Sequence, residues 1–281
     1  MIERTIRDGG RTWHAREYEL AEYLDLGATR PHTKNRDHWY QRICDGRARD
    51  SQLDWRGGGV IRAAELRTWT EGRRYMDRYN LDGAELPTVK SRKRRRCWSG
   101  DGDEFDRDRF DAGYLDCWQR RRRVTRDGRG AVRLTIELAA DHKKTAEQLI
   151  WSGAAACKLA DTLEAAGYRV AIDVTASVGE LNGKRSTPYN AADVIHAKGA
   201  ADPLNLDALL MAAACPMFFR FHVLCAMYRR PVKVNDHTGR VGETPEPLRG
   251  DIHIAKVVDQ YHAERTVREA LARINERSEA A

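Results

Sequence analysis

The sequence predicts an α/β fold, in which a doubly wound, largely parallel sheet follows an irregular, mostly helical N-terminal region. From residue 131 onward, segments with apolar residues at every second position alternate with segments of helical spacing. That alternation is typical of parallel strands joined by helices. Charge divides the chain at the same point, because residues 1–130 hold 30 Lys and Arg against 23 Asp and Glu, whereas residues 131–281 hold 19 of each. We therefore expect two domains, 1–130 and 131–281.

The C-terminal domain is expected to contain four strands and three helices. The first helix ends at Gly167, a natural C-cap. The second helix follows Asp202-Pro203 and is expected to break at Pro216, because proline disrupts a helix interior. The expected strands are residues 131–140, 168–178, 192–197 and 251–257, and the expected helices are residues 145–166, 204–228 and 262–274.

The N-terminal domain has weaker periodicity. We expect short helices at 17–26, through the segment HWYQRICDG, at 60–69 after the glycines 57–59, and from Thr70 onward. Those glycines lack the following G-K-[ST] of a nucleotide-binding loop, so a tight turn is expected there. Residues 80–130 are expected to be mainly loop. They include one short helix that turns four apolar side chains inward: Phe105, Phe110, Tyr114 and Leu115.

Composition restricts the class of protein. No segment reaches 18 uncharged apolar residues, so no membrane span is expected. The first residues lack the apolar core of a signal peptide, and we expect the protein in the cytoplasm of its host cell. The six cysteines form no C-x-x-C pair, which favours reduced, buried thiols over a structural zinc site.

Two arginine clusters point to a polyanionic partner. Six acidic residues lie between them, from Asp101 to Asp111, and six of the seven tryptophans precede residue 131. Guanidinium groups bind phosphates and indole rings stack on bases. A solvated loop whose acids neutralise one of the clusters is the alternative. The predicted nucleic-acid contacts are Arg92, Lys93, Arg94, Arg95, Arg96, Trp98, Arg120, Arg121, Arg122 and Arg123.

Several motifs resemble an uncharacterised domain family of bacteriophages and related mobile elements. They are W-x-G-G at Trp55, W-x-E-G at Trp69 and an acidic segment that ends at Cys117-Trp118. Further on, the helix with Gly153-Ala154-Ala155 and the D-P-L-x-L-D segment from Asp202 also match. The resemblance covers about residues 50–275, implies a phage or prophage origin, and implies no known activity.

The C-terminal domain is also similar to von Willebrand factor A (VWA) domains, which have a Rossmann-like, doubly wound fold. Many VWA domains bind Mg²⁺ through D-x-S-x-S after their first strand. Here the matching positions are Glu137, Ala139 and Asp141, so one hydroxyl ligand is absent. The resemblance implies a scaffold with a degenerate metal site and no cofactor. The alternative is an Mg²⁺ site formed by Glu137, Asp141 and Asp173, whose oxygens suit a hard cation.

No catalytic motif identifies an enzyme. The sequence lacks G-x-S-x-G and H-E-x-x-H, and the segment with Asp141 and His142 is read as a polar loop that opens a helix, with His142 as a general base the alternative. We therefore expect a non-enzymatic, phage-type protein that binds nucleic acid or acts as an adaptor beside it. One alternative is a protein–protein interaction module without nucleic-acid contact. Another is a metal-dependent nuclease or phosphatase. The choice between DNA and RNA, and the oligomeric state, stay open.

Overall fold

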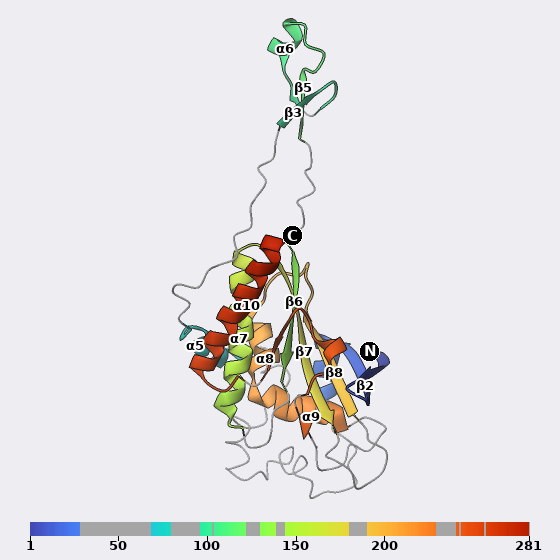
Figure 1. Ribbon diagram of the computed structural model, residues 1–281, viewed down its shortest axis with the longest axis vertical. Helices are drawn as coiled ribbons and strands as arrows, with labels where there is room; N and C mark the ends of the chain where they lie inside the picture. Colours follow the sequence, from blue (N-terminus) through green and yellow to red (C-terminus); the bar gives the residue numbers. More distant parts are fainter. Residues whose placement is uncertain are drawn as a thin grey trace, which may run out of the picture.

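The computed structural model describes residues 1–28, 69–79, 96–102, 104–121, 130–138, 144–179, 190–228, 240–241, 243–255 and 257–280. It is a mixed α/β structure in which long helices lie along one large sheet, and a second, small sheet is drawn apart from this main body (Figure 1). Among the described residues, no helix combines the length and the apolarity that a membrane span requires.

The large sheet contains strands from both ends of the chain. Its order is β1-β2-β8-β7-β6-β10, and β9 pairs with β7 outside that path. The pairs β2–β8, β6–β7 and β10–β6 are parallel, whereas β1–β2, β7–β8 and β7–β9 are antiparallel. The strands are β1 (Ile2–Asp8), β2 (Arg11–Glu19), β6 (Ala131–Glu137), β7 (Arg169–Gly179), β8 (Asn190–Lys198), β9 (Arg240–Val241) and β10 (Ile252–Ile254).

The β1–β2 hairpin differs from the mostly helical N-terminal region that the sequence predicts. Gly9 and Gly10 connect the two strands with φ angles of 55° and 75°, which are typical of a two-residue hairpin turn. Strand β2 then lies beside β8, so residues 11–19 and residues 190–198 are neighbours in one sheet. The helix expected at 17–26 is present as α1 (Leu20–Ala28) and begins after the hairpin.

The helices of the C-terminal part follow the prediction closely. Helix α7 (Ala146–Ala165) begins with a capping box in which Thr145 and Gln148 bind each other's backbone N–H groups, and Gly167 follows its end with φ of 90°. Such a box satisfies two N–H groups that would otherwise lack acceptors. The remaining helices are α5 (Glu71–Met76), α8 (Leu206–Ala214), α9 (Leu224–Tyr228) and α10 (Gln260–Ala280).

The break expected at Pro216 is also present. Helix α8 ends at Ala214, and Cys215 adopts an extended conformation with ψ of 114°, as the residue before a proline commonly does. The chain continues through a π-helix, η1 (Phe218–Val223), into α9. Two buried polar side chains, Arg220 and His222, lie on this π-helix.

The two faces of the large sheet have different chemistry. On one face, Leu134, Ile136, Ile172 and Val174 join an apolar core with α1, α5, α7, α8, α9 and α10. On β6 and β7 most of the alternate residues, among them Glu137 and Asp173, are polar and turn to the opposite face. The described long helices thus cover one face, and the expected doubly wound, VWA-like arrangement is not confirmed. The short helix η2 (Glu246–Leu248) places Leu248 against Trp13 on the opposite face.

The small sheet and its helix form a unit that we call the β3–β5 module, residues 96–102 and 104–121. It contains β3 (Arg96–Ser99), β4 (Glu104–Phe105), α6 (Arg107–Asp111) and β5 (Trp118–Arg121), and all strand pairs are antiparallel. Helix α6 lies in the segment where one short helix is predicted. Its N-cap is Asp106, whose Oδ1 accepts a hydrogen bond from the Arg109 backbone N–H at 3.0 Å.

Candidate functional site

The β3–β5 module brings parts of the two arginine clusters together. In its antiparallel register Arg96 lies opposite Arg121, and Cys97 lies opposite Arg120. Opposed Cα atoms in such a ladder are about 5 Å apart, although Arg96 and Arg121 are 25 positions apart in the sequence. The other predicted contacts of the two clusters, namely Arg92, Lys93, Arg94, Arg95, Arg122 and Arg123, lie outside the described residues.

Several acidic residues between the clusters have partners inside the module. The Asp116 Oδ1 lies 3.3 Å from Nη2 of Arg109, and the Asp111 Oδ2 lies 3.7 Å from Nε of Arg107. Asp106 caps helix α6. These three carboxylates therefore bind groups within the stretch from residue 106 to residue 116. The two ion-paired carboxylates thus bind Arg107 and Arg109, which belong to neither arginine cluster.

Aromatic side chains surround Arg109. Its guanidinium carbon lies 4.3 Å from the ring centroid of Trp98 and 4.4 Å from that of Tyr114, which is within the range of a cation–π contact. Phe105 packs against Trp118 with a centroid distance of 4.8 Å. One face of the Trp98 ring is therefore already occupied by Arg109, and base stacking on Trp98 would have to use the opposite face.

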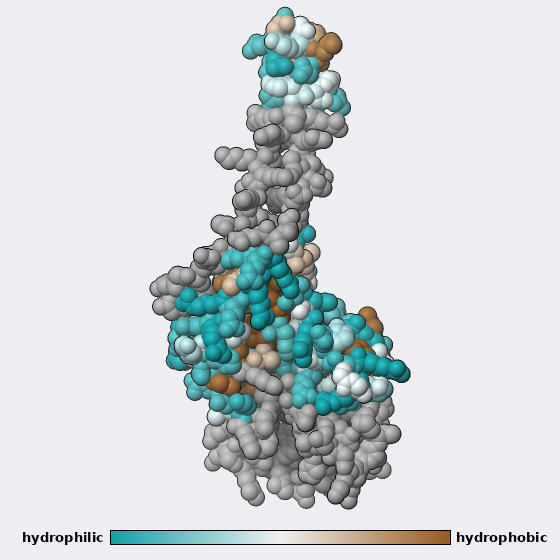
Figure 2. All heavy atoms as spheres, in the orientation of Figure 1, coloured by the Kyte–Doolittle hydropathy of each residue, from teal (hydrophilic) through white to brown (hydrophobic). Residues whose placement is uncertain are grey.

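The prediction that four apolar side chains of this segment turn inward is wrong. Their exposed fractions are 45% for Phe105, 58% for Phe110, 54% for Tyr114 and 93% for Leu115. A sheet of three short strands with one helix of five residues has too little surface to bury them. Apolar atoms are accordingly visible on the surface of the module (Figure 2).

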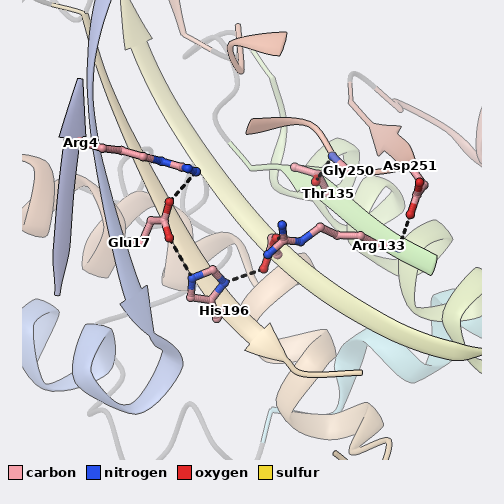
Figure 3. A network of polar contacts seen from close by, with 8 residues as sticks. Arg4, Glu17, Arg133, Thr135, His196, Gly250 and Asp251 are labelled. Carbon is pink, nitrogen blue, oxygen red and sulfur yellow. Dashed lines mark hydrogen bonds and ion pairs between the residues drawn. The ribbon is translucent and has the colours of Figure 1, made fainter. Parts of the chain in front are cut away.

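A row of charged side chains crosses the polar face of the large sheet. Each of five neighbouring strands, β1, β2, β8, β7 and β6, supplies one residue: Arg4, Glu17, His196, Asp173 and Arg133 (Figure 3). His196 lies between two carboxylates, with Nδ1 2.7 Å from Asp173 and Nε2 3.5 Å from Glu17. Asp173 also binds Nε of Arg133 at 2.7 Å. The row joins five strands through side-chain contacts and thereby stabilises their register.

Glu137 lies deeper on the same face. It is 4% exposed, and its carboxylate accepts hydrogen bonds from the Ser177 hydroxyl at 3.0 Å and from the Thr244 hydroxyl. Thr244 in turn lies 2.8 Å from the hydroxyl of Thr175. Hydroxyl donors around a buried carboxylate offset the loss of its hydration, so this group fixes the segment at residue 244 to the sheet.

The three residues of the alternative Mg²⁺ site are arranged differently. Glu137 and Asp173 share a face of the sheet, but Glu137 contacts hydroxyl groups and Asp173 contacts His196 and Arg133. Asp141 and the adjacent His142 lie outside the described residues. Within the part of the chain that the structure describes, no three His, Cys, Asp or Glu side chains are grouped closely enough to bind a metal ion.

The described cysteines fit the expected reduced, buried thiols. Cys117, Cys157 and Cys215 are free and buried. Burial raises the pKa of Cys215 to about 11 and also raises the pKa of Cys157. A thiol with a raised pKa is a poor nucleophile at neutral pH, because the reactive species is the thiolate. These two cysteines therefore have structural roles in the helical layer.

Sequence reasoning missed the charged row, apart from Asp173. Its N-terminal members, Arg4 and Glu17, lie in segments for which the sequence predicts irregular or helical structure. The available signal was the alternation of polar and apolar residues on both sides of Gly9-Gly10, in IERTIRD and RTWHAREYE. Alternation around a two-glycine turn predicts a β-hairpin, and here Arg4 and Glu17 lie on the same face as Ile6, Trp13 and Ala15.

Comparison with known families identifies the family of this chain. The family model of a domain of unknown function, DUF7192, matches residues 11–277, so the chain belongs to that family. The match includes β2, the β3–β5 module and nearly all of α10. Comparisons with curated proteins and with solved structures found no match.

Proposed function

We propose that this member of the DUF7192 family binds nucleic acid through the β3–β5 module and does not act on it chemically. The observation that carries the proposal is the strand register, which sets Arg96 opposite Arg121 and so joins the ends of the two arginine clusters. Arginines at opposed positions of a ladder suit a partner whose phosphates are closely spaced along a strand. A phage or mobile-element origin is part of this proposal and rests on the sequence motifs.

The predicted interaction is dependent on salt and only weakly selective for sequence. Arginine side chains bind phosphates, which are common to all sequences, whereas the described part of the module offers no long helix or ribbon to enter a groove. Exposed rings beside the clusters, with Trp98 at 37% exposure, add stacking surface for unpaired bases. We therefore expect single-stranded nucleic acid to bind at least as tightly as a duplex.

The experiment compares two variants that lose the same charge. The first, R96S/R120S/R121S, removes the three clustered arginines that the register places together. The control, R74S/R265S/R273S, removes three exposed arginines of α5 and α10. Both variants reduce the formal net charge from +7 to +4. If binding depended only on net charge, the two variants would therefore lose the same affinity for nucleic acid.

Fluorescence anisotropy with labelled single-stranded and duplex oligonucleotides measures the affinities over a series of salt concentrations. We expect the first variant to bind at least about tenfold more weakly, a loss of about 1.4 kcal/mol. We also expect a plot of the logarithm of its affinity against the logarithm of salt concentration to have a shallower slope. The slope should decrease in magnitude by up to about 0.9 for each lost contact with a duplex phosphate. Equal affinities of the two variants would contradict the assignment of the site. Mg²⁺-dependent cleavage of the oligonucleotide, abolished by Asp173→Asn, would instead support the metal-dependent nuclease.

A protein partner at the same module is the second candidate. The observation that favours it is the exposure of Phe110 and Leu115, at 58% and 93%. Exposed apolar side chains on a small unit commonly mark a protein interface. A partner from the host cell that binds the wild-type chain but not F110S/L115S, together with no retention of either oligonucleotide, would support the adaptor function over nucleic-acid binding.

A further inference from the structure

A cavity of about 540 Å³ lies on the polar face of the large sheet, distant in sequence from the β3–β5 module. This volume is within the range of small-molecule binding sites. The β1–β2 turn, strand β2, the segment 243–249 and β10 form its walls. Its principal lining residues are Arg11, Trp13, Glu243, Thr244, Arg249 and His253.

Several contacts hold the segment 243–249 against the β1–β2 turn. The Arg11 Nη1 lies 2.8 Å from Oε2 of Glu243, and the backbone N–H of Glu246 donates to Asp8 at 3.1 Å. Thr244 is anchored from the other side, since its hydroxyl donates to the buried Glu137 carboxylate. The walls of the cavity are therefore fixed by contacts on both sides of residue 244, and the site is formed before any ligand enters.

Trp13 supplies the first sign of a ligand. Its side chain is 2% exposed and lines the cavity, and its indole N–H has no hydrogen-bond acceptor among the described protein atoms. A buried donor without an acceptor costs about 1–3 kcal/mol. The neighbouring residues Ala15, Ala192, Val194 and Leu248 pack around the ring and are apolar. Because Trp13 lines the cavity, a ligand bound there is the candidate acceptor for this N–H.

Arginine donors make the cavity suitable for an anion. The Arg249 Nε donates to the Thr244 backbone carbonyl at 2.9 Å, which fixes the guanidinium group at the wall while its two terminal nitrogens take no part in that bond. Of the carboxylates among the described lining residues, Glu243 pairs with Arg11, and Asp8 accepts from the Glu246 backbone N–H. The donors of Arg249 and Trp13 thus favour a ligand rich in acceptor oxygens.

We propose that this cavity binds a small molecule through an oxyanion group, either phosphate or carboxylate, with Arg249 and the Trp13 indole N–H as donors. Guanidinium groups bind both anions in a planar, two-pronged geometry. The rest of the ligand occupies the remaining volume between the β1–β2 turn and β10. This site is independent of nucleic-acid binding by the β3–β5 module, and either proposal can fail without the other.

The test follows the indole N–H resonances of the full chain, labelled with ¹⁵N at tryptophan, by NMR. Trp13→Phe keeps an aromatic ring in the apolar pocket and identifies the Trp13 signal by its loss. Inorganic phosphate, AMP and succinate are titrated separately. We expect the Trp13 signal to move and saturate with at least one of them. Saturation with phosphate and AMP alone assigns phosphate chemistry, and saturation with succinate alone assigns a carboxylate.

Arg249→Gln, at an exposed position, is the binding variant, and Arg74→Gln on helix α5 is the matched control. We expect Arg249→Gln to weaken binding by at least about tenfold, which corresponds to 1.4 kcal/mol, and Arg74→Gln to leave it unchanged. No saturable change of the Trp13 signal with any of the three anions would overturn the proposal. Equal titration curves for the two variants would overturn it as well.

Discussion

Replacing Gly153 with alanine tests the close packing of α7 against α8. A Cβ atom at residue 153 would lie 2.1 Å from the carbonyl oxygen of Ala213 and 2.5 Å from the Cα of Ala214. Favourable carbon contacts are at about 3.5–4.0 Å, so the two helices would have to separate by more than about 1 Å. Both atoms belong to the backbone of α8, and no side-chain rotation relieves the overlap.

The expected loss of stability follows from two opposing effects. Overpacking of a core typically costs about 1–3 kcal/mol, and contact with a helix backbone places this site at the upper end. Alanine improves helix propensity over glycine by about 1 kcal/mol. We therefore expect Gly153→Ala to lower the free energy of unfolding by about 2 kcal/mol or more, and Tm by about 4 °C or more.

Urea denaturation followed by circular dichroism measures this difference. Gly130→Ala is the control, because among the described residues a Cβ there would meet only the Tyr168 ring, at 3.9 Å. We expect the control to be as stable as the wild type or slightly more stable, since alanine restricts the unfolded chain. If Gly153→Ala were also neutral or stabilising, helix propensity alone would explain it, and the close approach of α7 to α8 would be refuted.

Two further predictions concern buried polar side chains. Burial lowers the pKa of His222 to about 4. Between pH 6.5 and pH 4 the unfolded chain, in which histidine has its usual pKa of about 6.5, is protonated at this residue, whereas the folded protein is not. The free energy of unfolding therefore falls by about 3 kcal/mol as pH decreases from 6.5 to 4. His222→Phe should remove this component, and parallel pH dependences of the two proteins would contradict it. Asp173→Asn should lower the free energy of unfolding by about 1–3 kcal/mol, because it weakens contacts with His196 and Arg133. Urea titrations with EDTA and with Mg²⁺ should give the same loss, whereas a loss seen only with Mg²⁺ would indicate a metal ligand instead.

The helical layer was predictable because its signals are local. The apolar spacing of residues 145–166, the threonine before it and the glycine after it each indicate the same helix, and α7 has those boundaries within one residue. Pro216 likewise indicated the break after α8. Local propensity, capping and periodicity agree along this part of the chain, which is the condition under which sequence reasoning succeeds.

The sheet and the candidate sites depend on contacts between distant residues, and the sequence indicated them poorly. Nothing local to residues 11–19 shows that they pair with residues 190–198. The charged row likewise forms only when five strands lie in the order β1-β2-β8-β7-β6. For the arginine clusters, the sequence indicated the chemistry, but the opposition of Arg96 and Arg121 requires a strand register that charge patterning alone does not determine.

The most direct test of nucleic-acid binding by the β3–β5 module is the salt dependence of oligonucleotide affinity, measured by anisotropy for the wild type and for R96S/R120S/R121S. The proposal predicts that the logarithm of the wild-type affinity falls linearly with the logarithm of salt concentration, and that the variant has both a lower affinity and a shallower slope. Wild-type and variant lines that coincide would contradict it.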